Sequence, residues 1–370
     1  MGGRDCAMES VDGQMNGIDL DFYKGKRVFV TGHTGFKGSW LCRVLLNAGA
    51  AVTGYSLPAP TEPNLFSLAD IESRMVSVIG DIRDRAQLTA AFQEAKPEIV
   101  FHLAAQPIVR DSYRHPAGTY EVNVMGTVNL LECIRTAQIP VRSVVIVTTD
   151  KVYENQEWVW GYRENERLNG HDPYSNSKSC AELVAQTYQR SFFEGSDTAI
   201  STVRAGNVIG GGDFSRDRIL PDCVRAVQAG KRIIVRNPDS TRPYQHVLEA
   251  LLAYLMVAQR QYGDKDYAGW YNVGPEEQDC ITTGTLADMF CQKWGDGLAW
   301  VVQTERNAPH ESSFLKLDCT KLKTTFGWQP QWHIEQAVEK TVEWTKAWLL
   351  NEDLPAVMDR QICTYLQERR

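Results

Sequence analysis

The chain has 370 residues, of which 43% are hydrophobic, enough for two modest globular domains or one large domain with an added lobe. Lys and Arg total 39 against 46 Asp and Glu, and no long basic run favours nucleic-acid binding. Nine cysteines are scattered without a C-x-x-C pair, which indicates reduced thiols rather than disulfides or a zinc site. No apolar run approaches the roughly 18 residues of a spanning helix, so we expect a cytoplasmic protein without membrane association.

The amino-terminal stretch is polar and glycine-containing and lacks the apolar region of a signal peptide. We therefore expect residues 1–21 to form a disordered leader. The first predicted element follows it, because residues 27–31 are an apolar run with β-branched side chains that predicts a buried strand.

A glycine motif follows this strand directly, with the spacing Gly32-x-x-Gly35-x-x-Gly38, and residues 39–48 then carry apolar side chains at helical spacing. A strand, a glycine turn and a helix together aim backbone N–H groups and a positive helix terminus at a phosphate. The alternative is an ordinary strand-to-helix turn. We predict a dinucleotide site whose residues are Gly32, His33, Thr34, Gly35, Phe36, Lys37 and Gly38.

Strands and helices alternate through the first 204 residues. Strands are predicted at residues 51–55, 76–80, 99–103, 143–149 and 199–204, and helices at 84–95, 119–137 and 174–193. This alternation predicts an α/β protein with a Rossmann-type doubly wound parallel sheet. We assign residues 22–204 to an NAD-binding Rossmann domain.

The alternation loosens beyond residue 204, where residues 210–213 are predicted to be a flexible break. Further helices are predicted at 219–229, 246–262, 286–294 and 334–350, with strands at 233–235 and 270–273. We assign residues 205–370 mainly to a smaller α/β substrate-binding lobe that is interleaved with the main sheet.

The second strand ends without the acidic residue that normally binds the adenosine ribose about 20 residues past the glycines. Ser56 or Leu57 holds that position, and no nearby arginine suggests a 2′-phosphate. We therefore favour NAD, held weakly on its adenosine side. Other strand ends supply the remaining predicted cofactor contacts, which are Asp81, Ile82, Leu103, Ala104, Ala105 and Gln106.

Tyr174 and Lys178 are four residues apart, so they share one face of a predicted helix. A cation one turn away should lower the pKa of the phenol, which lets Tyr174 accept the proton of a secondary alcohol as hydride leaves for a nicotinamide. Thr149, at the end of the fifth strand, is placed to hydrogen-bond the same oxygen. The alternative is a buried tyrosine beside an unrelated surface lysine.

Asp150 and Lys151 follow Thr149 and suggest an additional reaction. A dehydrogenase or an epimerase needs no further acid and base, whereas a dehydratase does. Once C4 of a hexose is oxidised, Asp150 would protonate the departing C6 hydroxyl and Lys151 would help to remove the C5 proton. The alternative is that Lys151 pairs with Asp150 or with a phosphate.

Several long runs resemble bacterial CDP-glucose 4,6-dehydratases, which are sugar-nucleotide dehydratases of the extended short-chain dehydrogenase/reductase family. These runs are residues 24–41, 54–61, 242–247 and 315–318, and the resemblance spans roughly residues 22–350. The resemblance implies NAD-dependent conversion of CDP-D-glucose to CDP-4-dehydro-6-deoxy-D-glucose, a hydro-lyase step toward deoxysugars of surface polysaccharides such as lipopolysaccharide O-antigen. It also implies a homodimer or homotetramer, with pairs of subunits joined through the helices near 119–137 and 174–193.

The same resemblance implies substrate contacts at Asn207, Arg218, Arg242 and Asn272. Two departures from the wider family stand out. Lys151 replaces the glutamate that removes the C5 proton elsewhere, so the identity of that base is open. Residues 310–314 replace the His-Asp-Arg-Arg-Tyr run of dTDP-glucose dehydratases, in line with a different nucleotide base.

Three alternatives remain open on the sequence. The first is a sugar-nucleotide 4-epimerase, which would share the fold, the cofactor, Thr149, Tyr174 and Lys178. The second is a dehydratase acting on another nucleotide sugar. The third is a dinucleotide-binding scaffold without catalytic activity, against which the presence of both Tyr174 and Lys178 argues.

Overall fold

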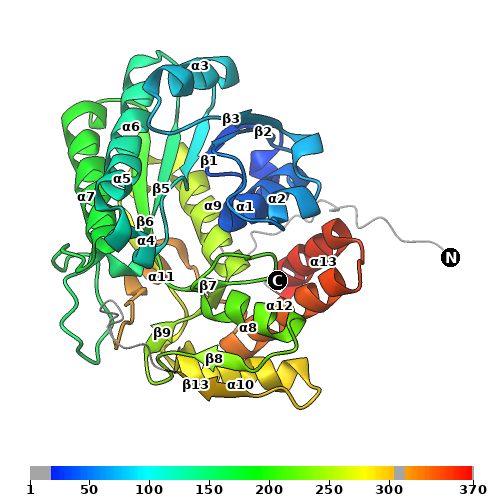
Figure 1. The fold of residues 1–370 in the computed structure, drawn as a ribbon. Coiled ribbons are helices and arrows are strands. Elements are labelled where there is room, and N and C mark those ends of the chain that lie inside the picture. Colours follow the sequence, from blue (N-terminus) through cyan, green and yellow to red (C-terminus); the bar gives the residue numbers. More distant parts are fainter. Residues whose placement is uncertain (1–17, 304–312, 369–370) are drawn as a thin grey trace.

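A seven-stranded parallel sheet organises the structure, a computed structural model that describes residues 18–303 and 313–368 (Figure 1). Its strand order is β11-β6-β5-β4-β1-β2-β3, so the order reverses beside β1. In open α/β sheets ligands bind outside the carboxyl ends of the strands at such a reversal. The strands are β1 (Arg27–Thr31), β2 (Ala51–Ser56), β3 (Val76–Ile79), β4 (Ile99–His102), β5 (Ser143–Thr149), β6 (Ala199–Ala205) and β11 (Trp270–Val273).

Helices cover both faces of this sheet, which confirms the predicted doubly wound fold. Strand β1 shows the arrangement, because Val28 and Val30 point into one core while Phe29 points into the other. Helices α1 (Phe36–Asn47) and α9 (Val247–Gly263) pack on the first face. The second face is covered by α3 (Arg85–Ala95), α6 (Gly126–Thr136) and α7 (Pro173–Tyr188).

A smaller α/β lobe lies below the main sheet in Figure 1 and has its own apolar core. Its helices are α8 (Ile219–Gln228), α10 (Thr283–Trp294) and α12 (Ile334–Leu349), and its strands β8 (Ile233–Val235) and β13 (Trp300–Val302) are parallel. Residues beyond 205 also supply α9 and β11 to the main layer, and α13 (Leu354–Glu368) packs into the larger core.

Short elements connect these layers. Two small sheets pair β7 (Val208–Ile209) with β10 (Gln245–His246), and β9 (Thr241–Pro243) with β12 (Cys280–Thr282). The short helices are η1 (Leu20–Tyr23), α2 (Leu65–Leu68), η2 (Glu72–Arg74), α4 (Val109–Arg114), α5 (Pro116–Tyr120), η3 (Glu121–Met125), η4 (Asp150–Val152), η5 (Gln189–Phe193), η6 (Lys265–Tyr267), η7 (Glu277–Asp279) and α11 (Thr320–Phe326).

Several predicted boundaries differ from the structure. Helix α1 begins at Phe36, three residues early, because Gly35 caps it in an extended conformation. The helix predicted at 119–137 starts at Pro116 and runs through α5, one π-helical turn at η3, and α6. Ile18 and Leu20 are buried in the main core, so the packed chain begins before residue 22, while residues 1–17 of the predicted leader lie outside the described residues.

The glycine run at residues 210–213 is a packed junction rather than a flexible break. The Trp40 indole N–H donates to the Gly211 carbonyl at 3.0 Å, and a Cβ built on Gly211 would lie 2.1 Å from Cγ of Trp344. Trp40 belongs to α1 and Trp344 to α12, so Gly211 lets helices of the two lobes approach the same short segment. The sequence indicated flexibility because it does not reveal which large side chains press on these glycines.

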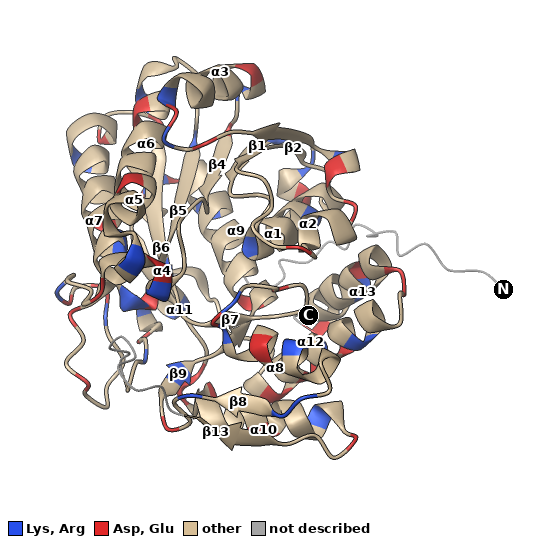
Figure 2. Ribbon diagram, in the orientation of Figure 1, with Lys and Arg blue, Asp and Glu red and all other residues tan. Residues whose placement is uncertain are grey.

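Charged residues of both signs are interspersed along the helices and loops in Figure 2. Many form exposed pairs, for example Lys293 with Glu339 at 2.8 Å, and such pairs are individually worth little. Among the described helices, none has both the length and the apolar character that a bilayer crossing requires.

We predict that Gly211→Ala lowers the free energy of unfolding by about 1–3 kcal/mol, because the added methyl overpacks the contact with Trp344. Gly263→Ala is the matched control, since a Cβ there meets nothing within 4 Å in the described part of the chain. That control should be neutral, or stabilising by up to about 1 kcal/mol. Urea unfolding of both variants measures the difference, and equal midpoints would contradict the packed junction.

Candidate active site

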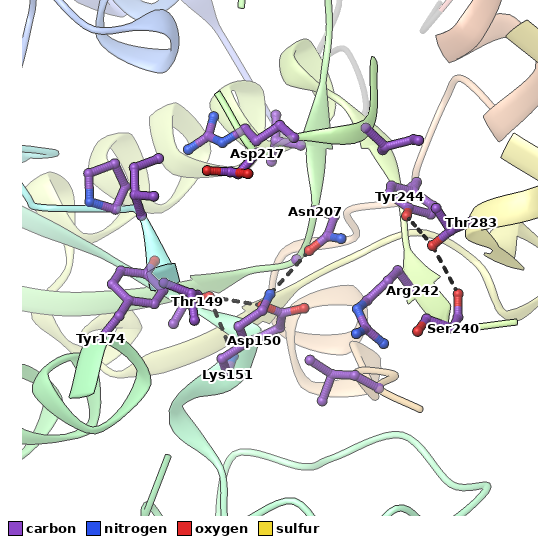
Figure 3. Close-up of a pocket in the computed structure, with 18 of the residues that line it drawn as sticks. Thr149, Asp150, Lys151, Tyr174, Asn207, Asp217, Ser240, Arg242, Tyr244 and Thr283 are labelled. Carbon is purple, nitrogen blue, oxygen red and sulfur yellow. Dashed lines mark hydrogen bonds and ion pairs between the residues drawn. The ribbon is translucent and has the colours of Figure 1, made fainter. Parts of the chain in front are cut away.

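A cavity of about 320 Å³ lies beyond the carboxyl ends of β5 and β6, where the main sheet meets the smaller lobe. It brings together residues predicted separately for catalysis, cofactor binding and substrate binding. Figure 3 shows Tyr174 and Thr149 on one side, Arg242, Tyr244 and Ser240 on the other, and Asp150, Lys151 and Asn207 between them. The predicted site residues that line the cavity are Lys37, Thr149, Asp150, Lys151, Tyr174, Asn207, Arg218 and Arg242.

The centre of the cavity is a hydrogen-bonded group at the end of β5. Every residue of β5 is buried, and the chain then turns into η4, which places Thr149, Asp150 and Lys151 in succession at the cavity wall. Thr149 Oγ1 donates to Asp150 Oδ1 at 2.9 Å. Lys151 Nζ donates to the same oxygen at 3.2 Å and to Asn207 Oδ1 at 3.2 Å.

The second carboxylate oxygen of Asp150 lacks the hydrogen bonds that the first oxygen accepts. Asp150 is fully buried, yet its Oδ2 has no hydrogen-bond partner among the described residues. A buried polar atom without a partner is costly and uncommon. Asp150 is also among the residues that line the cavity.

Tyr174 and Lys178 lie on the first turns of α7, which begins at Pro173 and is capped by the Asp172 side chain accepting from the Ser175 N–H. Lys178 is buried and its Nζ donates to the Val147 carbonyl of β5 at 3.2 Å. Desolvation lowers the pKa of Lys178 to about 8, although Glu182 acts in the opposite direction. The amine therefore lies beneath the site rather than in its open space.

The predicted lowering of the Tyr174 pKa is wrong for the chain without a ligand. Desolvation raises the pKa of Tyr174 to about 12, while Thr149 and Arg218 oppose that change. The effect of burial is larger than the effect of the nearby cation, because the charged phenolate loses more stabilisation by water than its neighbours supply. The tyrosine is thus a phenol in this state, and a positively charged ligand group would have to favour its ionisation.

Several positively charged side chains lie in or next to the cavity. Desolvation lowers the pKa of Lys37 to about 7, and the positive charges of Arg218, Lys178 and Lys151 act in the same direction against Asp150. Lys37 stands on the first turn of α1, and the structure directs it into the cavity. Arg218 donates to Asp213 at 2.9 Å, which fixes the guanidinium at the cavity wall.

Other residues that line the cavity were not identified from the sequence. Asp217 accepts from Arg236 at 2.8 Å and lies 3.8 Å from Arg110, and all three contribute to the wall. Arg110 comes from α4 and the other two from the smaller lobe, so no local spacing could have linked them. Tyr244, Ser240 and Thr283 also line the wall, joined by hydrogen bonds at 3.1 and 3.2 Å.

The glycine turn fits a dinucleotide. A Cβ on Gly38 would lie 2.1 Å from the Gly32 carbonyl oxygen, and a Cβ on Gly32 would lie 2.7 Å from the Ala104 nitrogen. A Cβ on Gly35 would meet only the Gly32 oxygen at 3.5 Å among the described atoms, and no described side chain caps α1 there. First-turn N–H groups without a capping side chain are suited to binding a phosphate.

Two residues of the predicted cofactor turn have side chains committed elsewhere. His33 is fully buried, its Nε2 lies 2.8 Å from Ser77 Oγ, and desolvation lowers its pKa to about 4. Thr34 hydrogen-bonds to Ser56 Oγ and to the Leu57 carbonyl, both at 2.9 Å. Only the backbone of these residues, together with Phe36 on the first turn of α1, remains for a cofactor contact.

The strand-end residues predicted for the cofactor also have protein partners. Asp81 pairs with Arg83 at 2.6 Å, and Ile82 is buried in the core of the second face. Leu103, Ala104 and Ala105 follow β4, where the Ala104 N–H donates to Thr31 Oγ1 at 3.2 Å. The Gln106 N–H donates to Asn123 Oδ1 at 2.8 Å, which fixes this segment next to the glycine turn.

The predicted substrate contact at Asn272 is wrong in its geometry. Asn272 is fully buried in β11 and does not line the cavity. Its side-chain amide donates to the Tyr162 and Asp318 carbonyls at 2.7 and 3.0 Å, and its Oδ1 accepts from the Tyr153 hydroxyl at 2.6 Å. Asn272 therefore ties the loop after β5 to the sheet, a role that no local sequence pattern reveals.

Comparisons with known proteins agree with this arrangement. The family model described as GDP-mannose 4,6 dehydratase matches residues 29–341. The chain is 50% identical over 356 residues to CDP-glucose 4,6-dehydratase of Salmonella typhimurium, covering 94% of this chain and 98% of that protein. It is 30% identical to UDP-glucose 4-epimerase of Mycolicibacterium smegmatis, covering 86% of this chain and 97% of that protein.

Solved structures share the fold at lower sequence identity. A UDP-glucose-4-epimerase of Stenotrophomonas maltophila, solved with bound NAD, superposes with a TM-score of 0.76 at 22% identity, covering 88% of this chain and 99% of that chain. At this identity the likeness shows the fold alone. Because the family model matches most of the chain and one relative is half identical along nearly its whole length, this protein belongs to the GDP-mannose 4,6-dehydratase family.

Proposed function

We propose that this protein is a CDP-glucose 4,6-dehydratase that converts CDP-D-glucose to CDP-4-dehydro-6-deoxy-D-glucose. The observation that carries the proposal is the 50% identity to the Salmonella enzyme of that name, which extends over 94% of the chain. The fully buried Asp150 with one unpaired oxygen supports the same reaction, since C4 epimerisation alone has no use for it. In this proposal the protein acts in the cytoplasm, in the synthesis of deoxysugars for surface polysaccharides.

The proposed cofactor is NAD. The uncapped start of α1 and the close approach of Gly32 to Ala104 support binding of its pyrophosphate at the glycine turn. Lys178 lies one helical turn after Tyr174 on α7 and would contact the same cofactor. When bound, NAD supplies a hydride acceptor for C4 of the sugar and a hydride donor for C6.

Tyr174 accepts the proton of the sugar 4-hydroxyl in this proposal. Its position in the cavity beside Thr149 suits that role, and Arg218 works against the desolvation that raises the pKa of Tyr174. Proton transfer by a positioned side chain contributes roughly 10²–10⁴-fold to a rate. Thr149 would hydrogen-bond the same sugar oxygen.

Asp150 and Lys151 carry out the loss of water. The unpaired Oδ2 of Asp150 is the atom that would protonate the departing 6-hydroxyl. Lys151 would take the C5 proton, for which its amine must be neutral. Asn207 Oδ1 and Asp150 Oδ1 hold the amine at 3.2 Å each, which would orient it during this step.

Arg218 and Arg242 are the proposed diphosphate contacts. Both line the cavity, and a guanidinium presents paired donors that match phosphate oxygens. Arg218 is restrained by Asp213 and Arg242 donates to the Thr241 carbonyl at 2.9 Å, so both groups are preorganised. Together they would hold the nucleotide while the sugar reaches Thr149 and Tyr174.

We predict that the protein, supplied with NAD, forms a 4-keto-6-deoxy sugar from CDP-glucose and at least 100-fold more slowly from dTDP-, UDP- or GDP-sugars. The alkali-induced absorbance of 4-keto-6-deoxy sugars measures this product. Tyr174→Phe is the matched control, because it removes the proton acceptor and leaves the ring. A signal only with another nucleotide would reject the CDP assignment, and a 4-epimerised product that retains its 6-hydroxyl would reject dehydration.

We also propose a homo-oligomer in which subunits meet through the helical face made by α5, η3, α6, α7 and η5. Helices α5, α6 and α7 of this face lie side by side in Figure 1. This face exposes large apolar side chains, with Met125 and Leu183 each 50% exposed and Phe192 51% exposed. Apolar side chains gathered on one face of a protein favour burial against a partner.

Leu183→Asp and Met125→Asp should therefore shift the protein toward monomers, because each places a charge in the proposed contact. Leu350→Asp is the control, since Leu350 is 70% exposed but follows α12 on the other lobe. Size-exclusion chromatography with light scattering measures the mass. Wild-type mass in both helix variants would contradict this interface.

A further inference from the structure

The face of the main sheet that α7 covers changes from apolar to polar near the site. In β5 the residues on this face are apolar as far as Ile146, and the next one is Thr148. In β6 the apolar Ile200 is followed on the same face by Thr202 and Arg204. All three polar residues are buried. Buried polar side chains therefore replace apolar ones directly before the residues at the end of β5 that line the cavity.

These polar groups converge on Glu182 of α7, which is fully buried. Thr148 Oγ1 donates to its Oε1 at 2.5 Å, and Thr202 Oγ1 donates to its Oε2 at 2.7 Å. Arg204 Nη2 donates to the same Oε2 at 2.9 Å, and neither side chain of this ion pair is exposed. Apolar side chains of similar volume are often as stable as a buried ion pair. A role besides stabilisation of the fold is therefore expected for the pair.

Arg204 extends the network to Tyr153, which follows η4. The Nη1 group of Arg204 donates to the Tyr153 hydroxyl at 2.8 Å, and this hydroxyl donates to Asn272 Oδ1 at 2.6 Å. Tyr153 is buried, and its hydroxyl both accepts and donates a hydrogen bond inside the protein. The hydroxyl group thus anchors the chain to β6 and β11.

The network holds both ends of residues 149–152, which form the catalytic segment of the proposed reaction. Thr148 directly precedes this segment and Tyr153 directly follows it, and each is hydrogen-bonded to one member of the buried ion pair. The glutamate of the pair belongs to α7, about two helical turns after Tyr174. These hydrogen bonds therefore fix the catalytic segment relative to the helix that carries the tyrosine.

We propose that Thr148 and Tyr153 are positioning residues, which set the catalytic segment against α7 so that both halves of the reaction act on one bound sugar. This inference rests on the proposed dehydratase function. In that function Tyr174 acts at the 4-hydroxyl, whereas Lys151 acts at C5 and Asp150 at the 6-hydroxyl. Both sets of groups must reach the same sugar, and a misplacement of about 1 Å can cost about 10²-fold in rate.

Loss of either anchor affects the two halves of the reaction unequally. Oxidation at C4 depends on Tyr174, which α7 still holds because the Asp172 cap of that helix is unchanged. Elimination depends on Asp150 and Lys151, and their segment is the one that loses its anchor. Oxidation should therefore continue while loss of water becomes slow, so that reduced nicotinamide accumulates.

Thr148→Val and Tyr153→Phe test the two anchors separately, because each removes one hydroxyl and retains the shape of the side chain. With NAD and CDP-glucose, each variant should lose roughly tenfold or more in kcat while KM stays within about twofold of wild type. Stopped-flow absorbance should show more reduced nicotinamide during turnover than in the wild type. Thr148→Ser, which retains a hydroxyl, should restore wild-type behaviour.

Thr202→Val is the matched control, because it removes a hydroxyl from the same carboxylate, whereas Thr202 pairs with Ile146 in the sheet rather than with the catalytic segment. This variant should lower the urea midpoint, as the test variants do, and leave kcat and the level of reduced nicotinamide close to wild type.

The positioning role is wrong if Thr148→Val and Tyr153→Phe behave as Thr202→Val does, or if their kcat falls without additional reduced nicotinamide. Either result leaves the dehydratase function intact, since the wild type still forms the 4-keto-6-deoxy sugar. A wild type that forms this product from no nucleotide sugar would instead overturn the proposed function, and the positioning role with it.

Discussion

The burial of strand β5 is the constraint on which the rest of the site depends. All seven residues from Ser143 to Thr149 are buried, and the strand pairs with β6 along its whole length and with β4 from Ser143 to Ile146. Such a strand cannot shift without exposing its apolar side chains or losing its hydrogen bonds. It therefore delivers Thr149 and Asp150 to a fixed place where water is scarce.

Loss of hydration then determines the direction in which the pKa values of the neighbouring groups shift. Desolvation is the largest influence on the pKa of Lys37, Tyr174 and Lys178. It lowers the pKa of the two amines and raises the pKa of the phenol. The same low polarity strengthens each remaining hydrogen bond and charge interaction inside the cavity.

The layered fold and the residues beside Thr149 were predictable because the signals are local and repetitive. The β-branched run of β5, the glycine spacing before α1 and the Tyr174–Lys178 spacing each occupy a few consecutive residues. Features that depend on distant partners were not predictable. Asn272 was predicted to contact the substrate, but carbonyls from two other segments turn its amide inward. Gly211 was predicted to be flexible, but Trp344 lies against it.

The central claim is that one hydride leaves C4 and returns to C6 of the same sugar after water has departed. CDP-glucose carrying deuterium at C4 tests it directly, with NMR and mass spectrometry of the product formed in a mixture with unlabelled substrate. The account predicts deuterium in the 6-methyl group of molecules that began labelled, with little crossover to the others. Deuterium lost to solvent, or retained at C4, would contradict it.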